Sequence, residues 1–519
     1  MAEVEQQQLR PPAAKAGSKL VFVGFMCAGK SRATRKLAPR AGREALDADA
    51  LLEERLGEPI ASYFEREGEP AFRERERELV LELLERPGPA FVPLGGGAIA
   101  SEEVRSALRE HTVVYVEVEP ETAWERASGT DRPLAQDRER FFDLYAQRVP
   151  LYEEVADVRL VWSDAGEGYP AFVGTGALEL AGTLWPRDGG RAFVVADERA
   201  EELHGDSLRR ALSERVEVAG SVGIPPGERS KTLAGAERIL RALAAAGMQR
   251  SDTVVALGGG VAGDLAGFCA ATYQRGVAVV HVPTTVVAQV DSAYGGKTGV
   301  DLPEGKNYVG AFHQPAAVIT DPRTLTTLPE AELQAGFAEV LKTGLLAGGR
   351  LWEDVRRMPP LRTALDTDLK LATRVIYGCA RLKQNVVGAD EHDHGLRASL
   401  NLGHTFAHAL ESATGYDRYR HGEAVALGLR VAMRLSERFA GLDPAVGGEV
   451  QELLERHGLP LRFEGPSTDL LVEHAGRDKK RRGDRRNLVL LRAPGEVEIE
   501  AEVPLAAFAR AIDEIRGAP

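Results

Sequence analysis

Short apolar segments alternate with longer, charged segments along most of the chain, and this alternation limits the possible folds more than any other feature. From residue 19 to about residue 163 the apolar segments read KLVFVG, FVPLG, TVVYVEV and VRLVW. A second series, AFVVAD, TVVALGGG, VAVVHVP and AAVITD, begins after residue 169. Apolar strands separated by stretches of helical length predict parallel sheets covered by helices. The sequence therefore predicts an α/β fold for both series.

The later part of the chain has a different pattern, which suggests how the chain divides. Helical periodicity dominates from about residue 329, and NLVLLRAPGEVEIEAEV near the end reads as a β-hairpin. A length of 519 residues corresponds to about three domains at ~150 residues each. We predict a disordered tail over 1–18, a P-loop α/β domain over 19–163 and a linker over 164–168. A Rossmann-like α/β domain over 169–328 and a mainly α-helical domain over 329–519 follow.

Composition and charge exclude several classes of protein. The chain is 44% hydrophobic and 28% charged, as in ordinary globular proteins. It has no run of 18 apolar residues, and its N-terminus lacks the apolar core of a signal peptide. Three widely spaced cysteines, Cys27, Cys269 and Cys379, predict a reducing compartment, most simply the cytoplasm. A net charge of −13 argues against nucleic acid or an anionic membrane as partner. Phosphorylated substrates would require local clusters of lysine and arginine.

A phosphate-binding motif follows the first predicted strand. Residues 24–31, GFMCAGKS, fit G-x-x-x-x-G-K-S and precede a helical stretch. Such glycines let the backbone curl so that its N–H groups and the helix N-terminus face a phosphate. Lys30 would then bridge the β- and γ-phosphates, and Ser31 would hold Mg²⁺. A glycine-containing βα turn without a ligand is the alternative.

Further motifs in the first region suggest what accepts the phosphate. They are Asp47-Ala48-Asp49, Arg73, Gly95–Gly97, Asp131–Leu134 and Arg148–Tyr152. With these motifs in this order, nearly all of residues 19–163 resembles shikimate kinase. The resemblance implies ATP-dependent phosphorylation of shikimate to shikimate 3-phosphate with Mg²⁺. Forked guanidinium groups suit a carboxylate substrate, and in-line phosphoryl transfer needs positioning and positive charge.

The shikimate kinase resemblance assigns roles to individual residues. Lys30, Asp49 and Arg132 would be catalytic, with Asp49 orienting the attacking hydroxyl and Arg132 on a mobile lid. The implied ATP and Mg²⁺ contacts are Gly24, Ala28, Gly29, Lys30, Ser31, Arg32 and Asp47. The implied shikimate contacts are Asp49, Arg73, Gly95, Gly96, Gly97 and Arg148. Read singly, Asp49 could instead be a helix N-cap and Arg73 part of a solvated run. Cys27 stands where the family commonly has glycine, as an oxidation-sensitive thiol or an inert filler.

The second half contains glycine-rich loops and a cluster of metal-ligand residue types. GGGVAGD at 258–264 follows an apolar strand, although such loops also serve as plain turns. Lys297 and Lys306 lie on glycine-rich segments typical of phosphate binding, with a solvated loop as the alternative. His404 and His408 are four residues apart, so they share one helix face. With His421 and Glu339 they suggest a catalytic Zn²⁺ site that leaves a position open for substrate. Capping or buried structural histidines are the alternative.

Residues 169–519 resemble 3-dehydroquinate synthase. The signatures are PGERSKT, LGGGVAGDLAGF, VPTTVVAQVDSAYGGKTGVD, GKNYVGAFHQP, GFAEVLK, NLGHTFAHALE and HGEAVALG. The resemblance implies two cofactors, NAD and a Zn²⁺ or Co²⁺ ion, and the metal would be held by Glu339, His404 and His421. It also implies catalytic roles for Lys342 and His408. It also implies a homodimer formed through this half.

The family's remaining contacts map onto two groups of residues. The implied NAD contacts are Asp197, Glu228, Lys231, Gly259, Gly260, Val261, Asp264, Thr284, Thr285 and Thr327. The implied substrate contacts are Arg275, Asp291, Lys297, Lys306, Asn307, Lys342, Lys383, Arg397, Asn401, His408 and one of Lys479 and Lys480. The sequence departs from the family pattern at two places. Glu198-Arg199 follows Asp197 where the family usually has an Asp-x-Asn-like adenosine contact, so only Asp197 carries over as an implied NAD contact. Tyr294 replaces a small aliphatic residue.

The two resemblances together imply a bifunctional enzyme of aromatic amino acid biosynthesis. Its second half would convert 3-deoxy-arabino-heptulosonate 7-phosphate to 3-dehydroquinate and phosphate. NAD would transiently oxidise the substrate, phosphate would leave by β-elimination, and reduction, ring opening and an aldol closure would follow. The alternatives are another sugar-phosphate cyclase or a metal-dependent polyol dehydrogenase. A degenerate scaffolding half is disfavoured because Lys30, Asp49 and the metal-ligand residues are all present.

Overall fold

The computed structural model describes residues 18–130, 133–162, 168–393, 395–476, 481–482 and 485–517. The expectations for the N-terminal tail up to residue 17, for the linker up to residue 167, and for Arg132, Lys479 and Lys480 lie outside the described residues. Within the described part of the chain, no helix is both long enough and apolar enough to cross a membrane.

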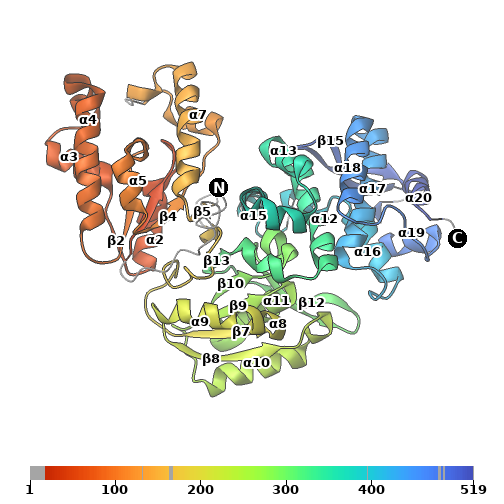
Figure 1. Cartoon of the computed structure of the whole chain (residues 1–519). Helices are drawn as coiled ribbons and strands as arrows, with labels where there is room; N and C mark the ends of the chain where they lie inside the picture. The colour runs from red at the N-terminus through yellow and green to blue at the C-terminus, as the bar shows by residue number, and fades with distance from the viewer. Residues whose placement is uncertain are drawn as a thin grey trace.

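The first part of the chain is a parallel sheet covered by helices (Figure 1). Its strands, in the order β2-β3-β1-β4-β5, are fully or largely buried apart from the short edge strand. This burial on both faces explains why they read as continuous apolar runs. The strands are β1 (Leu20–Val23), β2 (Glu44–Ala45), β3 (Ala90–Pro93), β4 (Thr112–Tyr115) and β5 (Val158–Val161). The helices are α2 (Lys30–Arg40), α3 (Ala48–Leu56), α4 (Ile60–Glu85), α5 (Glu102–Leu108), α6 (Pro120–Ala127) and α7 (Arg138–Val155).

The second part is also a parallel sheet with helices, in the strand order β6-β13-β10-β9-β7-β8. Its strands are β6 (Ala171–Val173), β7 (Ala192–Asp197), β8 (Val218–Ile224), β9 (Thr253–Gly258), β10 (Ala278–Pro283) and β13 (Ala317–Thr320). Its helices are α8 (Glu198–Ala200), α9 (Asp206–Ser213), α10 (Leu233–Ala245) and α11 (Gly260–Thr272). A separate two-stranded ribbon is formed by β11 (Lys297–Leu302) and β12 (Gly305–Phe312). The α/β class predicted from the alternation is confirmed in both parts.

One pair of strands joins the two sheets into a single sheet of 11 strands. β5 and β6 run antiparallel, with Arg159 opposite Val173 and Val161 opposite Ala171. The apolar core is continuous across this junction, because Leu160, Phe172 and Ile319 belong to one buried cluster. The sequence shows two α/β series but contains no signal that their sheets are joined.

The last part is mainly helical, as the sequence predicts, and it packs beside the second sheet (Figure 1). Its helices are α12 (Glu330–Ala347), α13 (Gly349–Arg357), α14 (Leu361–Thr367), α15 (Leu369–Ala389), α16 (His404–Ala413), α17 (His421–Phe439), α18 (Pro444–Arg456), α19 (Thr468–Gly476) and α20 (Leu505–Glu514). The strands β14 (Arg481–Arg482), β15 (Arg485–Ala493) and β16 (Glu496–Pro504) form a small antiparallel sheet. The predicted hairpin is confirmed by the pairing of β15 with β16.

Candidate active sites

The P-loop between β1 and α2 curls tightly around the side chain of Lys30. Its Nζ donates hydrogen bonds to the carbonyl oxygens of Gly24, at 2.8 Å, and Phe25, at 3.0 Å. Gly24 has φ 148°, and a Cβ built there would lie 2.3 Å from the Val116 oxygen, so only glycine fits. Ser31 lies with Arg32 in the first turn of α2, directly after Lys30. The loop therefore places a lysine, a hydroxyl and a helix N-terminus at one point, as phosphate binding requires.

Cys27 departs from the usual glycine at a position where backbone conformation matters. Its φ of 61° lies in the left-handed region that glycine enters without strain. The side chain is half-buried and forms no disulfide. The departure therefore adds backbone strain to the loop.

The predicted acceptor residues converge on the glycine loop after β3. The helix N-cap of α3 is Asp47, which accepts a hydrogen bond from the Asp49 amide, so the N-cap reading of Asp49 is wrong. A Cβ on Gly95 would lie 2.8 Å from Asp49 Oδ1, and one on Gly97 would lie 1.9 Å from Arg73 Nη1. Arg148 is buried, and its Nη1 donates to the carbonyl oxygen of Gly96 at 3.2 Å.

Glu76 belongs to this group of residues, and the sequence analysis missed it. The side chain is buried, and Oε2 accepts a hydrogen bond from Arg73 Nη1 at 2.5 Å. Burial raises the pKa of Glu76, while the charges of Arg73 and Arg148 oppose that rise. In the sequence Glu76 is hidden in the charged run RERERE, where only its spacing of three from Arg73 is a signal.

The implied NAD residues gather at the carboxyl ends of the second sheet. Asp197 ends β7, Gly259 and Gly260 follow β9, and Thr284 and Thr285 follow β10. In open α/β sheets this edge is where ligands bind. A Cβ on Gly259 would lie 2.9 Å from the Thr285 side chain, so the close approach of these loops requires glycine.

Other implied NAD residues are linked by direct contacts at this edge. Lys231 is buried, and its Nζ lies 2.6 Å from Asp264 Oδ2 and 3.7 Å from a Glu228 oxygen. It also donates a hydrogen bond to Asn307, which the sequence analysis assigned to the substrate pocket. Val261 lies in the first turn of α11 and Thr327 at the end of the 3-10 helix Pro322–Thr327. Lys231 thus connects the implied NAD residues with an implied substrate residue.

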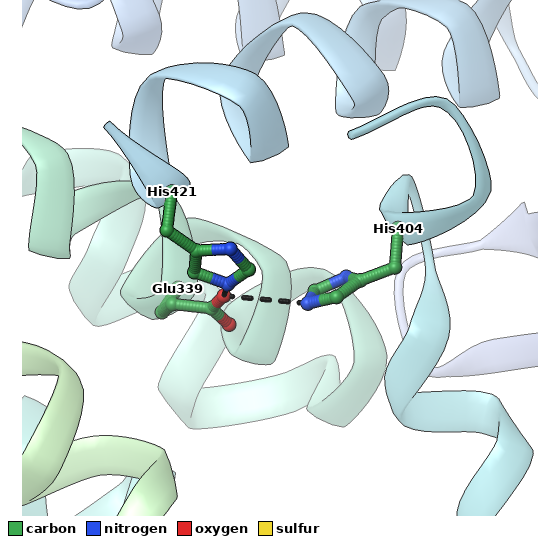
Figure 2. A group of neighbouring side chains, drawn as sticks. All are labelled: Glu339, His404 and His421. Carbon is green, nitrogen blue, oxygen red and sulfur yellow. Dashed lines mark hydrogen bonds and ion pairs between the residues drawn. The ribbon is translucent and has the colours of Figure 1, made fainter. Parts of the chain in front are cut away.

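Glu339, His404 and His421 meet although they come from three different helices, α12, α16 and α17 (Figure 2). One potential ligand atom from each lies within 4.8 Å of the others. Glu339 Oε1 lies 3.5 Å from His404 Nε2 and 3.2 Å from His421 Nε2. Both histidines begin their helices, so the cluster forms where two helix N-termini approach the middle of α12. Two imidazoles and one carboxylate are the donor set of a catalytic zinc site.

The groups around this cluster orient the imidazoles. His404 Nδ1 lies 3.2 Å from the carbonyl oxygen of Leu402, and His421 Nδ1 lies 3.4 Å from Glu411 Oε2. In both cases Nε2 is left to face Glu339, as in metal sites with carboxylate- or carbonyl-oriented histidines. Burial lowers the pKa of His421, but hydrogen bonds to Glu339 and Glu411 outweigh it and raise the pKa to about 10. The sequence analysis missed Glu411, the last residue of its motif NLGHTFAHALE.

Several implied substrate residues lie next to the cluster. Lys342 is buried, with Nζ 2.6 Å from Glu339 Oε2, and Lys383 forms an ion pair with Asp291. Burial lowers the pKa of Lys342, but Glu339 and Asp291 outweigh this effect and raise it, so its ammonium group persists. His408 and Asn401 line a cavity of about 100 Å³ together with His404.

The remaining implied substrate residues are placed less uniformly. Arg397 is buried and donates to the carbonyl oxygen of Gly295 at 3.2 Å. Lys306 Nζ lies 3.9 Å from Glu411, and Lys297 Nζ lies 2.7 Å from Asp393 Oδ2. Arg275, in contrast, is exposed and precedes β10, at the amino ends of the strands. The contacts within the described chain do not bring Arg275 to the cluster.

Tyr294, the second departure from the family pattern, is fully buried and directly precedes Gly295. Its hydroxyl lies 2.9 Å from Thr320 Oγ1. The larger side chain is therefore accommodated in the core with its polar atom satisfied.

Comparison with known proteins agrees with the two sites. Family models match at residues 221–335 (3-dehydroquinate synthase N-terminal) and 336–481 (3-dehydroquinate synthase C-terminal). A curated 3-dehydroquinate synthase from Halorhodospira halophila is 44% identical over 346 residues, which cover 66% of this chain and 96% of that protein. The chain belongs to the 3-dehydroquinate synthase family. The shikimate kinase family model matches residues 26–167. The chain is thus a bifunctional shikimate-pathway enzyme with a kinase half and a synthase half.

Two solved structures show the same fold as the synthase half. One is 2-deoxy-scyllo-inosose synthase complexed with carbaglucose-6-phosphate, NAD⁺ and Co²⁺, which is 25% identical with a TM-score of 0.61, covering 69% of this chain and 99% of that one. The other is 2-epi-5-epi-valiolone synthase from Streptomyces hygroscopicus subsp. jinggangensis with NAD⁺ and Zn²⁺ bound. It is 26% identical with a TM-score of 0.61, covering 67% of this chain and 96% of that one. Both are named as synthases of other products than the one named for the more similar curated relatives.

Proposed function

We propose that the kinase half transfers phosphate from ATP to shikimate by the following division of labour. The P-loop amides and Lys30 bind the ATP phosphates, Ser31 and Asp47 hold the accompanying Mg²⁺, and Asp49 accepts the proton of the attacking hydroxyl. The guanidinium groups of Arg73 and Arg148 bind the shikimate carboxylate as charged hydrogen-bond donors. The observation that supports this proposal is the convergence of Asp49, Arg73 and Arg148 on the glycines after β3.

Glu76 gives the kinase proposal a specific test. We expect Glu76→Gln to position the Arg73 guanidinium less firmly, because a neutral amide replaces the buried carboxylate that binds Arg73 Nη1. The KM for shikimate rises about tenfold, a binding loss of about 1.4 kcal/mol, while the KM for ATP changes little. Steady-state kinetics with each substrate varied in turn measures this. Glu78→Gln is the matched control, since Glu78 pairs at the surface with Arg75. An equal rise in both KM values would contradict the assignment.

For the synthase half we propose that Glu339, His404 and His421 hold a divalent metal and that the loops at the carboxyl edge of the sheet hold NAD. The residues fit both groups. The three potential metal-ligand atoms lie within 4.8 Å of one another, and the glycine-lined start of α11 suits a pyrophosphate. When bound, NAD supplies reversible redox chemistry and the metal supplies a Lewis acid.

The chain's own charged groups account for the handling of 3-deoxy-arabino-heptulosonate 7-phosphate. Lys342 keeps a proton beside the metal-ligand cluster, where a substrate hydroxyl would react. Lys383, paired with Asp291, and the buried Arg397 supply positive charge for the carboxylate and phosphate groups. Lys306, Asn307 and His408 extend this positive and polar lining. These local cations allow a chain of net charge −13 to bind a polyanionic substrate.

The product distinguishes the proposed reaction from that of other cyclases. The curated relatives named 3-dehydroquinate synthase are at 40–44% identity, whereas the two synthases of other names are at 25–26%. The higher identity favours 3-dehydroquinate as product. A net polyol dehydrogenase would accumulate NADH, whereas this reaction releases phosphate without a lasting change in NADH absorbance.

Selective removal of the metal tests the assignment of two independent chemistries. We expect a strong Zn²⁺ chelator to lower 3-dehydroquinate formation at least about 100-fold, because no metal ion then stabilises the negative charge that develops in the transition state. Shikimate phosphorylation persists when Mg²⁺ is kept in excess. Both activities are measured on one preparation, and Zn²⁺ or Co²⁺ is then added back. Full synthase activity in the chelated protein would contradict the metal proposal.

We also propose that the enzyme acts in the cytoplasm and forms a homodimer through the synthase half. The three cysteines are free, which fits a reducing compartment. The negative net charge favours small-molecule substrates over nucleic acid or an anionic membrane.

A further inference from the structure

The junction between the kinase and synthase halves contains a partly buried network of charged groups. Arg159, on β5, has a side chain only 12% exposed. Its guanidinium carbon lies 5.1 Å from the Tyr115 ring centre on β4 and 5.5 Å from the Tyr377 ring centre on α15. Its nitrogens contact Glu117 at 2.6 Å and Glu153 at 3.0 Å. A kinase arginine thus lies between aromatic rings of both halves.

Two arginines of the synthase half complete this network. Arg350, on α13, lies 3.3 Å from Glu153 and 3.9 Å from Glu117. Arg381, on α15, forms an ion pair with Glu119 and lies 3.7 Å from Glu117. We call the six residues Glu117, Glu119, Glu153, Arg159, Arg350 and Arg381 the junction network. Three carboxylates face three guanidinium groups, and Glu117, with 7% exposure, is shared by all three arginines. Loss of one member would leave a partner charge poorly compensated.

Apolar and backbone contacts reinforce the same junction. α15 lies beside β5 in Figure 1, and Val161 of β5 shares a buried cluster with Ile376 and Ala380 of that helix. Gln384, also on α15, donates to the carbonyl oxygen of Tyr169 at 2.6 Å. Separating the halves would therefore expose apolar surface and break the β5–β6 pairing together with the ion pairs.

The junction network lies against elements of both active sites. On the synthase side, Arg381 is two residues from Lys383, which pairs with Asp291 beside the metal-ligand cluster. On the kinase side, the Tyr145 hydroxyl donates to the carbonyl oxygen of Val118, between Glu117 and Glu119, at 2.9 Å. The Tyr145 ring packs at 5.2 Å against Phe25 of the P-loop. The segment Glu117–Glu119 is therefore linked through Tyr145 to the P-loop, and Arg381 shares helix α15 with the implied substrate residue Lys383.

We propose that the junction network makes the two halves unfold as one cooperative unit, so that a ligand bound in one active site protects the other from thermal unfolding. A ligand that binds only the native state stabilises the whole cooperative unit that contains its site. The continuous sheet and the shared apolar core supply the structural unit, and the charged network holds α15 against it. Catalysis in the two sites stays independent, while their stability is shared.

The test uses the full chain, with scanning calorimetry and the activities that survive a heat challenge. We expect one unfolding transition, with a midpoint that rises by roughly 2 °C at a ligand concentration 100 times its Kd. NAD⁺ raises the inactivation midpoint of the kinase as much as that of the synthase. Shikimate with a non-hydrolysable ATP analogue protects the synthase in the same way. A ligand that protects its own activity and leaves the other unchanged overturns the proposal. The NAD⁺ arm depends on the cofactor proposed above, whereas the shikimate arm does not.

Variants of the ion pair between Arg381 and Glu119 identify the junction as the cause. Arg381 is not among the implied substrate contacts, and Arg381→Glu reverses its charge. We expect two unfolding transitions, in which each ligand protects only its own activity. The exchange of both charges, Arg381→Glu with Glu119→Arg, restores this ion pair but leaves Glu117 facing a carboxylate, so we expect it to restore the shared shift in part. Arg438→Glu is the matched control, because Arg438 pairs with Glu514 away from the junction. In this variant we expect one ligand still to raise the inactivation midpoints of both activities. The role of the network is overturned if one ligand still protects both activities in Arg381→Glu. It is also overturned if the control variant loses this shared protection.

Discussion

Replacing His404 with alanine lowers 3-dehydroquinate formation at least about 100-fold and leaves shikimate phosphorylation unchanged. The substitution removes one of the two imidazoles that face Glu339, and two remaining donors hold a divalent metal poorly. The kinase keeps its rate because α16 packs against α17 and α19 of the helical part. Separate assays of the two reactions measure the effect, and metal content by elemental analysis reports whether the loss of activity follows the loss of metal.

The control for this variant is another histidine of the helical region. His474, on α19, bonds to Ser412 at 2.8 Å and is not a member of the metal-ligand cluster. His474→Ala keeps both activities and the metal content. A His404→Ala protein that retains its metal and its synthase rate would exclude this site. Loss of both reactions in a protein that melts like the wild type would contradict the independence of the two chemistries.

Replacing Lys30 with alanine has the reverse effect, with shikimate phosphorylation falling at least about 100-fold and 3-dehydroquinate formation unchanged. Lys30 is the cation around which the P-loop curls, and its loss removes positive charge from the transferring phosphate. Initial rates of shikimate phosphorylation and of phosphate release by the synthase measure the two effects on one preparation.

Lys36 provides the comparison, because it lies on the same helix α2 outside the P-loop. Lys36→Ala keeps both reactions, whereas Lys30→Ala loses only one. Calorimetry of each variant separates a lost reacting group from a lost fold, since shared unfolding would affect both halves together. A kinase rate in Lys30→Ala within a few-fold of the wild type would show that the loop does not bind the transferring phosphate.

Where chemistry depends on a short contiguous motif, the sequence was sufficient. The P-loop around Lys30 lies in one local pattern, G-x-x-x-x-G-K-S, which predicts a glycine loop between a strand and a helix, and the structure has that order. The buried apolar strands β1, β9 and β10 were also visible, because strands covered on both faces are continuously apolar. The short or less buried strands β2 and β8 carry no such signal and were missed.

Residues whose role depends on how elements pack together were not predictable in this way. Glu76 looks like one charge in a solvated run until folding buries it against Arg73. Glu411 orients the His421 imidazole only after folding brings the two side chains together. Arg275 carries a family signature, but its place before β10 puts it at the strand ends opposite the cluster. Glu411 and His421 lie on different helices, and the burial of Glu76 depends on how α4 packs against the glycine loop after β3. Local sequence encodes neither arrangement.

The sequence by itself determined the α/β class, the two enzyme families and the candidate residues for each reaction, since these depend on local periodicity and on motifs of a few residues. Only the tertiary structure decided that β5 pairs with β6, that the sheets of both halves become one, and that Arg159, Arg350 and Arg381 meet three carboxylates at the junction. Strand pairing and ion pairing between distant segments depend on which surfaces are buried together, and that is settled when the whole chain packs.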